Sequence, residues 1–145
     1  MTLQTVRAVF ESWLTTQFNA MTTPPVAIVY DNVQETPPAD PTQDWVLINI
    51  SYPSITEPIL CPDESGIEYI RGNIQVSCYA PRGFGMLRVE ELASVAATAL
   101  CSVNTAPDPN NVRPRVGSIA GPQAIGTGDS PYMLSVVSAP FSARG

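Results

Sequence analysis

The stretch GNIQVSCYAPRGFGMLRVEELASVAATAL, residues 72–100, changes from one apolar periodicity to another. In its first part every second residue is apolar, which predicts a strand whose packed face consists of Ile74, Val76, Cys78 and Ala80. From about Met86 to Cys101 the apolar residues recur at helical spacing, with polar residues on the opposite side. The stretch therefore predicts a strand, a tight turn and an amphipathic helix. The alanines of this helix allow its backbone to approach a sheet closely.

A second amphipathic helix is expected near the N-terminus, over residues 3–21. Its apolar side chains, Phe10 and Trp13 among them, recur at helical spacing, and Thr2 is placed to cap the first turn. Two threonines and two prolines at residues 22–25 end the pattern, because proline disfavours a helical conformation in the residue before it. We expect Phe10 and Trp13 to lie in the core.

Most of the remaining apolar runs indicate strands. Val26–Tyr30 is short and rich in β-branched residues, which fits a strand covered on both faces. In Trp45–Tyr52 apolar residues alternate with polar ones, so one side should be packed and the other wetter. The other expected strands are Ile67–Arg71 and Ile74–Ala80, either separate or as one strand bent at Gly72, then a weak strand at Val116–Ile119 and a last strand at Tyr132–Phe141.

This order of elements predicts the α+β class. Strands mostly follow one another and do not alternate with helices, which favours a mostly antiparallel central sheet flanked by two main helices. A chain of 145 residues suits one domain, residues 1–145. Two stretches rich in proline or glycine, residues 34–44 and 117–131, are expected to be long loops, and we expect at least one of them to contact an adjacent subunit or a partner.

Cysteine usage and hydropathy indicate the cellular setting. Cys61, Cys78 and Cys101 lie far apart, so they suggest neither a zinc site nor a disulfide framework. No secretory signal is visible at the N-terminus, and no run approaches the roughly 18 apolar residues of a transmembrane helix. We expect a soluble protein that is made in a cytoplasm and has no membrane partner.

The charged residues argue against several functions. The formal net charge is −6, and all seven cations are arginines. Without a basic cluster the chain cannot neutralise the phosphates that tight nucleic-acid binding requires, and we interpret Arg113 and Arg115 as part of a solvated loop. The chain also has no histidine, the side chain used most often in acid–base catalysis and in binding transition metals. We expect no catalytic residue, no metal site and no cofactor.

The turn Pro81-Arg82-Gly83-Phe84-Gly85 is the segment most suggestive of ligand binding. Free backbone N–H groups at the start of a helix, with an arginine beside them, suit an anion. The segment matches neither the phosphate-binding loop nor the dinucleotide fingerprint, and glycines serve any turn that needs positive φ. A structural role is favoured, and a small-anion-binding protein is the less favoured alternative.

Several segments follow one another between Val6 and Cys101: VRAVFESWL, VAIVYDNV, a loop containing PP, DWVLINI, YIRGNIQVSCYAPRGFGM and RVEELASVAATAL. In this order they resemble the tail terminator (tail completion) proteins of long-tailed bacteriophages. In that family YDN followed by PP and W recurs, as does a strand that ends in a proline and glycine turn before an alanine-rich helix.

The resemblance implies a tail-terminator-like fold and a structural virion protein. Such a protein forms a homohexameric ring that caps the tail tube and joins the tail to the head connector. Its implied partners are the tail tube protein, a head–tail connector or stopper protein and, if the tail is contractile, the sheath protein; DNA is only passing cargo. The implied location is the virion neck at the head–tail junction, after assembly in the host cytoplasm. Another neck component, a connector or stopper, is the alternative.

A ring subunit needs two different contact patches, because each copy meets its neighbours through unlike surfaces. The candidate subunit or partner contacts lie on the expected loops and the turn, and they are Pro37, Pro38, Asp40, Arg82, Phe84, Gln123 and Asp129. An acidic channel wall would also repel DNA phosphates and keep the passing duplex from sticking.

Overall fold

Two long antiparallel strands, β4 (Tyr69–Pro81) and β7 (Tyr132–Arg144), pair along their full lengths at the centre of the sheet. The structure is a computed structural model that describes residues 2–22, 26–30, 43–52, 59–60, 69–83, 86–105, 112–125 and 131–144. β4 passes through Gly72 without a break, so the two strands considered for this region are one. The apolar alternation predicted for Ile74 to Ala80 is confirmed, since all four inward residues are buried.

Shorter strands extend the sheet on both sides in the order β1-β2-β4-β7-β5, while β3 pairs with β4 and β6 with β7. Only β1 and β2 pair in parallel; every other pairing among the described strands is antiparallel. The predicted α+β class with a mostly antiparallel sheet is therefore confirmed. The bounds of the shorter strands are β1 (Ala27–Tyr30), β2 (Trp45–Ser51), β3 (Ile59–Leu60), β5 (Arg113–Val116) and β6 (Ala120–Ile125).

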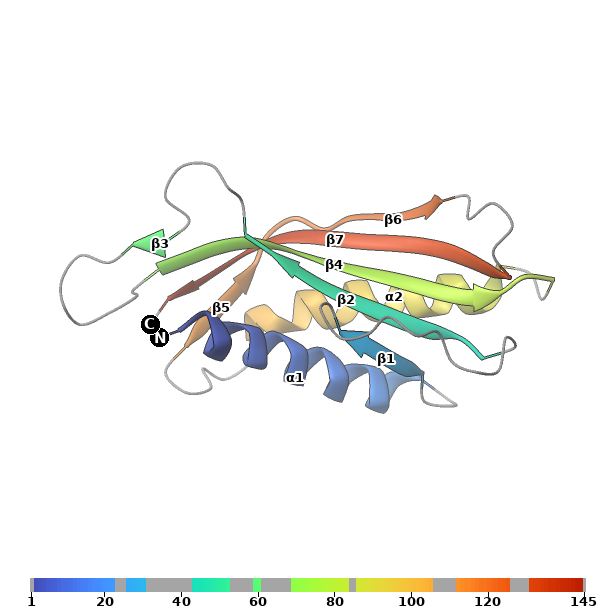
Figure 1. The fold of residues 1–145 in the computed structure, drawn as a ribbon, viewed down its shortest axis with the longest axis horizontal. Helices are drawn as coiled ribbons and strands as arrows, with labels where there is room; N and C mark the ends of the chain where they lie inside the picture. Colours follow the sequence, from blue (N-terminus) through green and yellow to red (C-terminus); the bar gives the residue numbers. More distant parts are fainter. Residues whose placement is uncertain are drawn as a thin grey trace.

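Both main helices, α1 (Leu3–Met21) and α2 (Leu87–Ser102), lie against the same face of the sheet (Figure 1). A single 3₁₀ turn, η1 (Val103–Thr105), follows α2. The predicted cap of α1 is confirmed, because Thr2 Oγ1 accepts a hydrogen bond from Thr5 N at 3.1 Å. The cap satisfies one of the backbone donors that a helix start leaves without an intrahelical partner.

The core fills the space between these helices and the sheet. Phe10 of α1 is fully buried and its ring centroid lies 4.7 Å from that of Phe141 on β7. The predicted face of α2 is confirmed, since its apolar and alanine residues are buried: Val89, Leu92, Ala93, Ala96, Ala99 and Leu100. The expectation for Trp13 is only partly met. Its side chain is half-buried at the edge of the core, where Nε1 donates to Ser102 Oγ at 2.9 Å.

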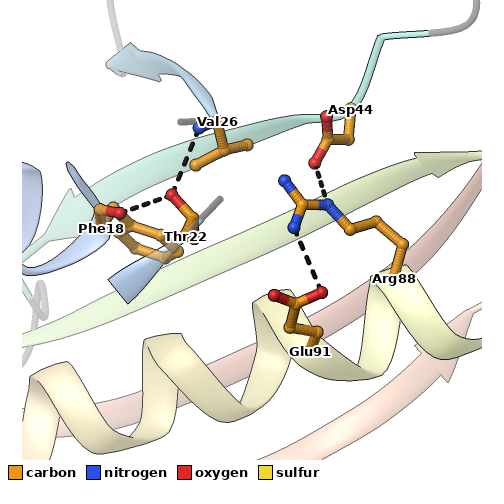
Figure 2. A network of polar contacts seen from close by, with 6 residues as sticks. All are labelled: Phe18, Thr22, Val26, Asp44, Arg88 and Glu91. Carbon is orange, nitrogen blue, oxygen red and sulfur yellow. Dashed lines mark hydrogen bonds and ion pairs between the residues drawn. The ribbon is translucent and has the colours of Figure 1, made fainter. Parts of the chain in front are cut away.

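A buried threonine joins the end of α1 to the start of the sheet. Thr22 Oγ1 donates to the carbonyl oxygen of Phe18 and accepts from Val26 N at 3.3 Å (Figure 2). The Phe18 carbonyl also accepts from Thr22 N at 3.0 Å, so the hydroxyl adds a second bond at the helix end and links it to Val26. β1 then begins as the first strand of the sheet. All four of its residues are half-buried, so the expectation of a strand covered on both faces is wrong.

The C-terminal third departs most from the sequence predictions. The weak strand expected at Val116–Ile119 is wrong, because the strand there is β5, which ends at Val116. The expected loop at 117–131 is wrong over Ala120–Ile125, which forms β6 on the edge of β7. Residues 126–130, and residues 34–42 of the other expected loop, lie outside the described residues. β5 and β6 share one edge of β7, each pairing with a different half of it.

Candidate functional site

The face of the sheet that points away from the helices carries the most distinctive surface chemistry. Its central rows, read across β2, β4 and β7, are Trp45–Tyr79–Leu134, Leu47–Ser77–Val136 and Asn49–Gln75–Ser138. Partners in register point to the same side of a sheet. No helix of the described part of the chain lies on this side (Figure 1). We call this surface the open sheet face.

One end of the open sheet face holds an aromatic patch, made of Trp45, Tyr79 and Tyr132. The Trp45 and Tyr79 rings stack with centroids 4.0 Å apart, and Tyr132 meets Trp45 edge-on at 6.1 Å. Trp45 is only 6% exposed and Tyr132 5%, yet neither belongs to the core cluster under the helices. The Trp45 indole N–H is buried without a hydrogen-bond partner. A buried donor without a partner costs about 1–3 kcal/mol.

The other end of the open sheet face holds an arginine patch. Two neighbouring rows in register form it, Tyr69–Arg144–Arg113 and Arg71–Ser142–Arg115. The register of β4 with β7 runs without a shift from Tyr69 to Pro81, so these rows lie on the same side as the aromatic patch. All four arginines are exposed and Tyr69 is half-buried.

Tyr69 organises two of the four guanidinium groups. Arg71 Nε donates to the Tyr69 hydroxyl at 3.0 Å, and its Cζ lies 5.8 Å from the Tyr69 ring centroid. Arg144 Cζ lies 5.4 Å from the same centroid, within the range of a cation–π interaction. An open pocket of about 250 Å³ lies beside them, with Tyr69, Arg71, Arg115 and Ser142 in its wall. Guanidinium groups beside a pocket suit a carboxylate or phosphate, which accept paired hydrogen bonds from this planar group.

The structure corrects the sequence interpretation of the basic residues. Arg113 and Arg115 lie in β5 and not in a solvated loop. Pairing of β5 and β4 with the end of β7 brings Arg71 and Arg144 beside them. Sequence reasoning missed this cluster because its members come from three separate segments. The usable signal was the alternate pair Arg113 and Arg115, which meets the single arginines of the other two strand ends, Arg71 and Arg144, only when the strands pair.

Near the aromatic end, on the helix side, Arg88 joins α2 to the start of β2. Its Nε lies 2.6 Å from Asp44 Oδ2 and its Nη1 lies 3.1 Å from Glu91 Oε2 (Figure 2). Partial burial opposes the charge on Arg88, but the hydrogen bonds to Asp44 and Glu91 outweigh it and raise the pKa of this guanidinium. The Arg88 guanidinium therefore stays charged, and its contacts hold the first turn of α2 against the residue before β2.

Of the seven contact residues predicted from the sequence, the described residues include Arg82 and Gln123. Arg82 is exposed, and its Nε donates to the Tyr132 carbonyl oxygen at 3.3 Å while its backbone N donates to Pro131 O at 2.9 Å. Gln123 is exposed on β6, in register with Val136. Both residues thus lie beside the first half of β7. The other five, Pro37, Pro38, Asp40, Phe84 and Asp129, lie outside the described residues.

The backbone conformation of the turn after β4 explains why its first glycine is present. Gly83 has φ +90°, a conformation that residues with a Cβ rarely adopt. Arg82 bonds to the backbone of the neighbouring strand end, so its side chain helps to hold the turn against β7. These contacts support the structural role favoured from the sequence for this part of the turn.

Two absences concern only the residues that the structure describes. Among them, no three or more histidine, cysteine, aspartate or glutamate side chains gather closely enough to hold a metal ion. Within the same residues, neither helix combines the length and the hydropathy needed to cross a membrane.

Alkylation should distinguish the two described cysteines. Cys78 is fully buried, and burial raises the pKa of its thiol to about 12, so the reactive thiolate is scarce at neutral pH. Cys101 is exposed. We expect iodoacetamide to modify Cys101 and leave Cys78 intact in the folded protein, as measured by mass spectrometry of tryptic peptides. Both should react in urea, which is the control; rapid modification of Cys78 without denaturant would contradict the burial.

Comparison with known proteins supports the fold and leaves the function open. No protein-family model matches the chain, and no curated protein does. Nineteen chains of solved structures match it. One of them is 25% identical, with a TM-score of 0.73 over 100% of this chain and 97% of the other. That protein is designated by a sequence identifier alone, without a functional description, so the similarity concerns the fold along nearly the whole of both chains.

Proposed function

We propose that this chain is a structural virion protein, the tail terminator of a long-tailed bacteriophage, which forms a homohexameric ring on the end of the tail tube. The observation that carries the proposal is the open sheet face, with chemically different patches at its two ends. A ring that closes by rotation joins unlike surfaces of adjacent copies, and each subunit must therefore carry two such surfaces.

The sequence motifs that resemble the family form the frame on which these patches lie. VRAVFESWL falls in α1, and YIRGNIQVSCYAP is β4. DWVLINI begins at Asp44, the residue before β2, and ends at Ile50 within it. RVEELASVAATAL falls in α2. These segments build the sheet and its helical layer, so the resemblance concerns the scaffold that displays the open sheet face.

The proposed role needs no catalysis by this chain. Its partners would be further copies of itself, the tail tube protein below the ring and a connector or stopper protein above it. A contractile tail would add the sheath protein, and DNA would pass through the ring without being held. The protein would be found in the neck, at the head–tail junction of the virion.

Electron microscopy of particles made without this protein tests the proposal. If it ends tail growth and joins the tail to the head, its loss should give overlong tails, or tails separate from filled heads. Expression of the wild-type chain in the same cells should restore normal particles, which controls for effects on neighbouring genes. A reconstruction of the complete particle should show six copies at the head–tail junction. A ring of twelve, or a position elsewhere in the particle, would overturn the assignment in favour of another neck or capsid role.

A further inference from the structure

The two edges of the sheet differ in how their backbone groups are used. The strand order places β1 at one edge, while β5 and β6 share the other, on the far side of β7 (Figure 1). An edge strand presents backbone N–H and C=O groups that can pair with a strand of another molecule, and proteins usually close such an edge with proline, charge or a covering element. The edges therefore indicate where a further strand can be added.

The outer edge of β5 is closed to pairing. Asn104 of η1 donates from Nδ2 to the Val116 carbonyl oxygen at 2.9 Å, and its Oδ1 accepts from Val116 N at 2.7 Å. Gly117 N bonds to Pro140 O on β7 at 2.8 Å, so the groups of the preceding Val116 point away from β7. Pro114, two residues earlier, points the same way and has no N–H. β5 therefore presents no row of donors and acceptors.

The outer edge of β1 has none of these features. Its sequence, AIVY, contains no proline, no glycine and no charge. Among the residues that the structure describes, β2 is the sole strand that pairs with β1, and no backbone hydrogen bond from another element reaches its outer edge. Alternate residues of a strand point their backbone groups to opposite sides, so half of the β1 groups face outward. β1 is thus an edge to which a strand can be added.

The side chains of β1 continue the two faces of the sheet up to this edge. Ile28 and Tyr30 pack against the core under the helices. Val29 is in register with Leu47 and therefore points to the open sheet face. One row in register crosses this face from β1 to β6 and consists of Val29, Leu47, Ser77, Val136 and Gln123. The open sheet face thus extends from one edge of the sheet to the other.

We propose that the outer edge of β1 pairs with the outer edge of β6 of an adjacent copy of this chain, so that the sheets of neighbouring copies join. This inference rests on the proposed ring and identifies the surfaces that would close it. β1 and β6 are unlike strands at opposite edges of one sheet, as a head-to-tail contact requires. Pairing of β1 with β1 would instead relate two copies by a two-fold axis and end at a dimer.

The direction and position of β6 suit this role. The pairings across the sheet make β6 run opposite to β1, so the new pair is antiparallel when adjacent copies keep the strand direction. Residues 120–123 are exposed. Pro122 and the shift of register lie in the first half of β6, whereas residues 123–125 pair with β7 without a shift. We therefore expect the regular second half of β6 to pair with β1.

The short length of β1 makes a single contact weak. Its four residues form few backbone hydrogen bonds with an added strand. In a closed ring each copy is held at both edges of its sheet, so the contacts support one another. We therefore expect self-association that rises steeply with protein concentration.

Cross-linking of two different cysteine variants tests which strands meet. In a background with Cys61→Ser and Cys101→Ser, one variant carries Val29→Cys, and a second variant with a different tag carries Gln123→Cys. Both positions point to the open sheet face, so a short bismaleimide should join the two variants when they are mixed. We expect a mixed-tag dimer and no dimer of either variant alone. A dimer of Val29→Cys with itself, or the absence of a mixed dimer at every concentration, would overturn the inference.

A lysine on the edge strand tests the contact without a cross-linker. Edge lysines prevent strands from pairing, because an added strand would bury the charge. In sedimentation velocity, we expect Val29→Lys to raise the dissociation constant of self-association at least about tenfold. Asn49→Lys adds the same charge to an exposed position of the same face on β2, and this matched control should stay within about twofold of the wild type. Thermal melting checks that each variant folds. Equal dissociation constants for the two lysine variants would contradict the edge contact.

This inference and the proposed function can fail separately. If folded Val29→Lys assembles six-membered rings as well as the wild type does, the edge contact is wrong while the ring remains. If Val29→Cys and Gln123→Cys cross-link but the particle shows no six-membered ring of this chain at the neck, the edge contact stands while the tail-terminator assignment fails.

Discussion

Phe10→Ala is expected to lower the free energy of unfolding by about 3–5 kcal/mol, the usual cost of truncating a buried aromatic side chain. Phe10 is fully buried, and its ring meets Phe141 with centroids 4.7 Å apart. Removing the ring leaves a cavity between α1 and β7 that the surrounding side chains fill only in part. The loss is a large share of the roughly 5–15 kcal/mol by which domains are stable.

Urea denaturation followed by circular dichroism measures this effect. Phe10→Leu keeps most of the volume and should cost clearly less than the alanine variant, which separates lost packing from any other effect of the substitution. A loss below about 1 kcal/mol for Phe10→Ala would show that α1 is not anchored to the sheet through this residue. The burial of Trp13 differs from that of Phe10, because the Trp13 ring is only half-buried at the edge of the core.

Gly72→Ala is expected to destabilise the protein by about 1–3 kcal/mol, although alanine normally favours a folded strand over glycine. A Cβ at this position would lie 2.5 Å from Phe141 Cζ and 2.7 Å from the carbonyl oxygen of Ser51. The phenyl ring is held in the core by Phe10, and the carbonyl belongs to the adjacent strand β2. Neither neighbour can move away without opening the packing between sheet and helices.

Gly83→Ala is the matched control for this clash. Gly83 has φ +90°, but no atom lies within 4 Å of a Cβ built there. Its substitution should therefore cost only the strain of the backbone conformation, about 1–2 kcal/mol. Phe141→Leu separates the two causes when it serves as the new reference. Measured against the Phe141→Leu single variant, the cost of Gly72→Ala should be smaller than in the wild type, whereas the cost of Gly83→Ala should be unchanged. If Gly72→Ala leaves the urea midpoint unchanged, the strands separate at this position more easily than the structure indicates.

Trp45 differs from Trp13 in its surroundings, because Trp13 lies half-buried at the edge of the core under the helices. Its ring is covered by Tyr79 and Tyr132 on the open sheet face, outside the core under the helices. Its indole N–H has no acceptor, whereas the Trp13 indole donates to Ser102. The aromatic patch is therefore a second packed cluster outside the core under the helices, in which Trp45 and Tyr132 are buried and Tyr79 is half-buried.

Local periodicity was sufficient for the elements whose own side chains decide their structure. The helical stripe of α1, its Thr2 cap and the alternation of β4 from Ile74 to Ala80 were all predicted, with bounds within a few residues. In each of these, burial of one apolar face stabilises the element, and that face is legible in the residues themselves. The α+β class followed from the order of these elements.

Only the tertiary structure decided where the weakly patterned segments lie and which charges meet. Ala120–Ile125 contains Gly121 and Pro122, yet it becomes β6 because the edge of β7 supplies hydrogen-bond partners that no local pattern records. In the same way, Arg71, Arg115 and Arg144 form one patch through the register of β4, β5 and β7. Strand pairing joins residues that are distant along the chain, whereas periodicity reports only neighbours. The sequence by itself therefore determined the apolar frame of this protein, and strand pairing determined the surface that we propose it uses.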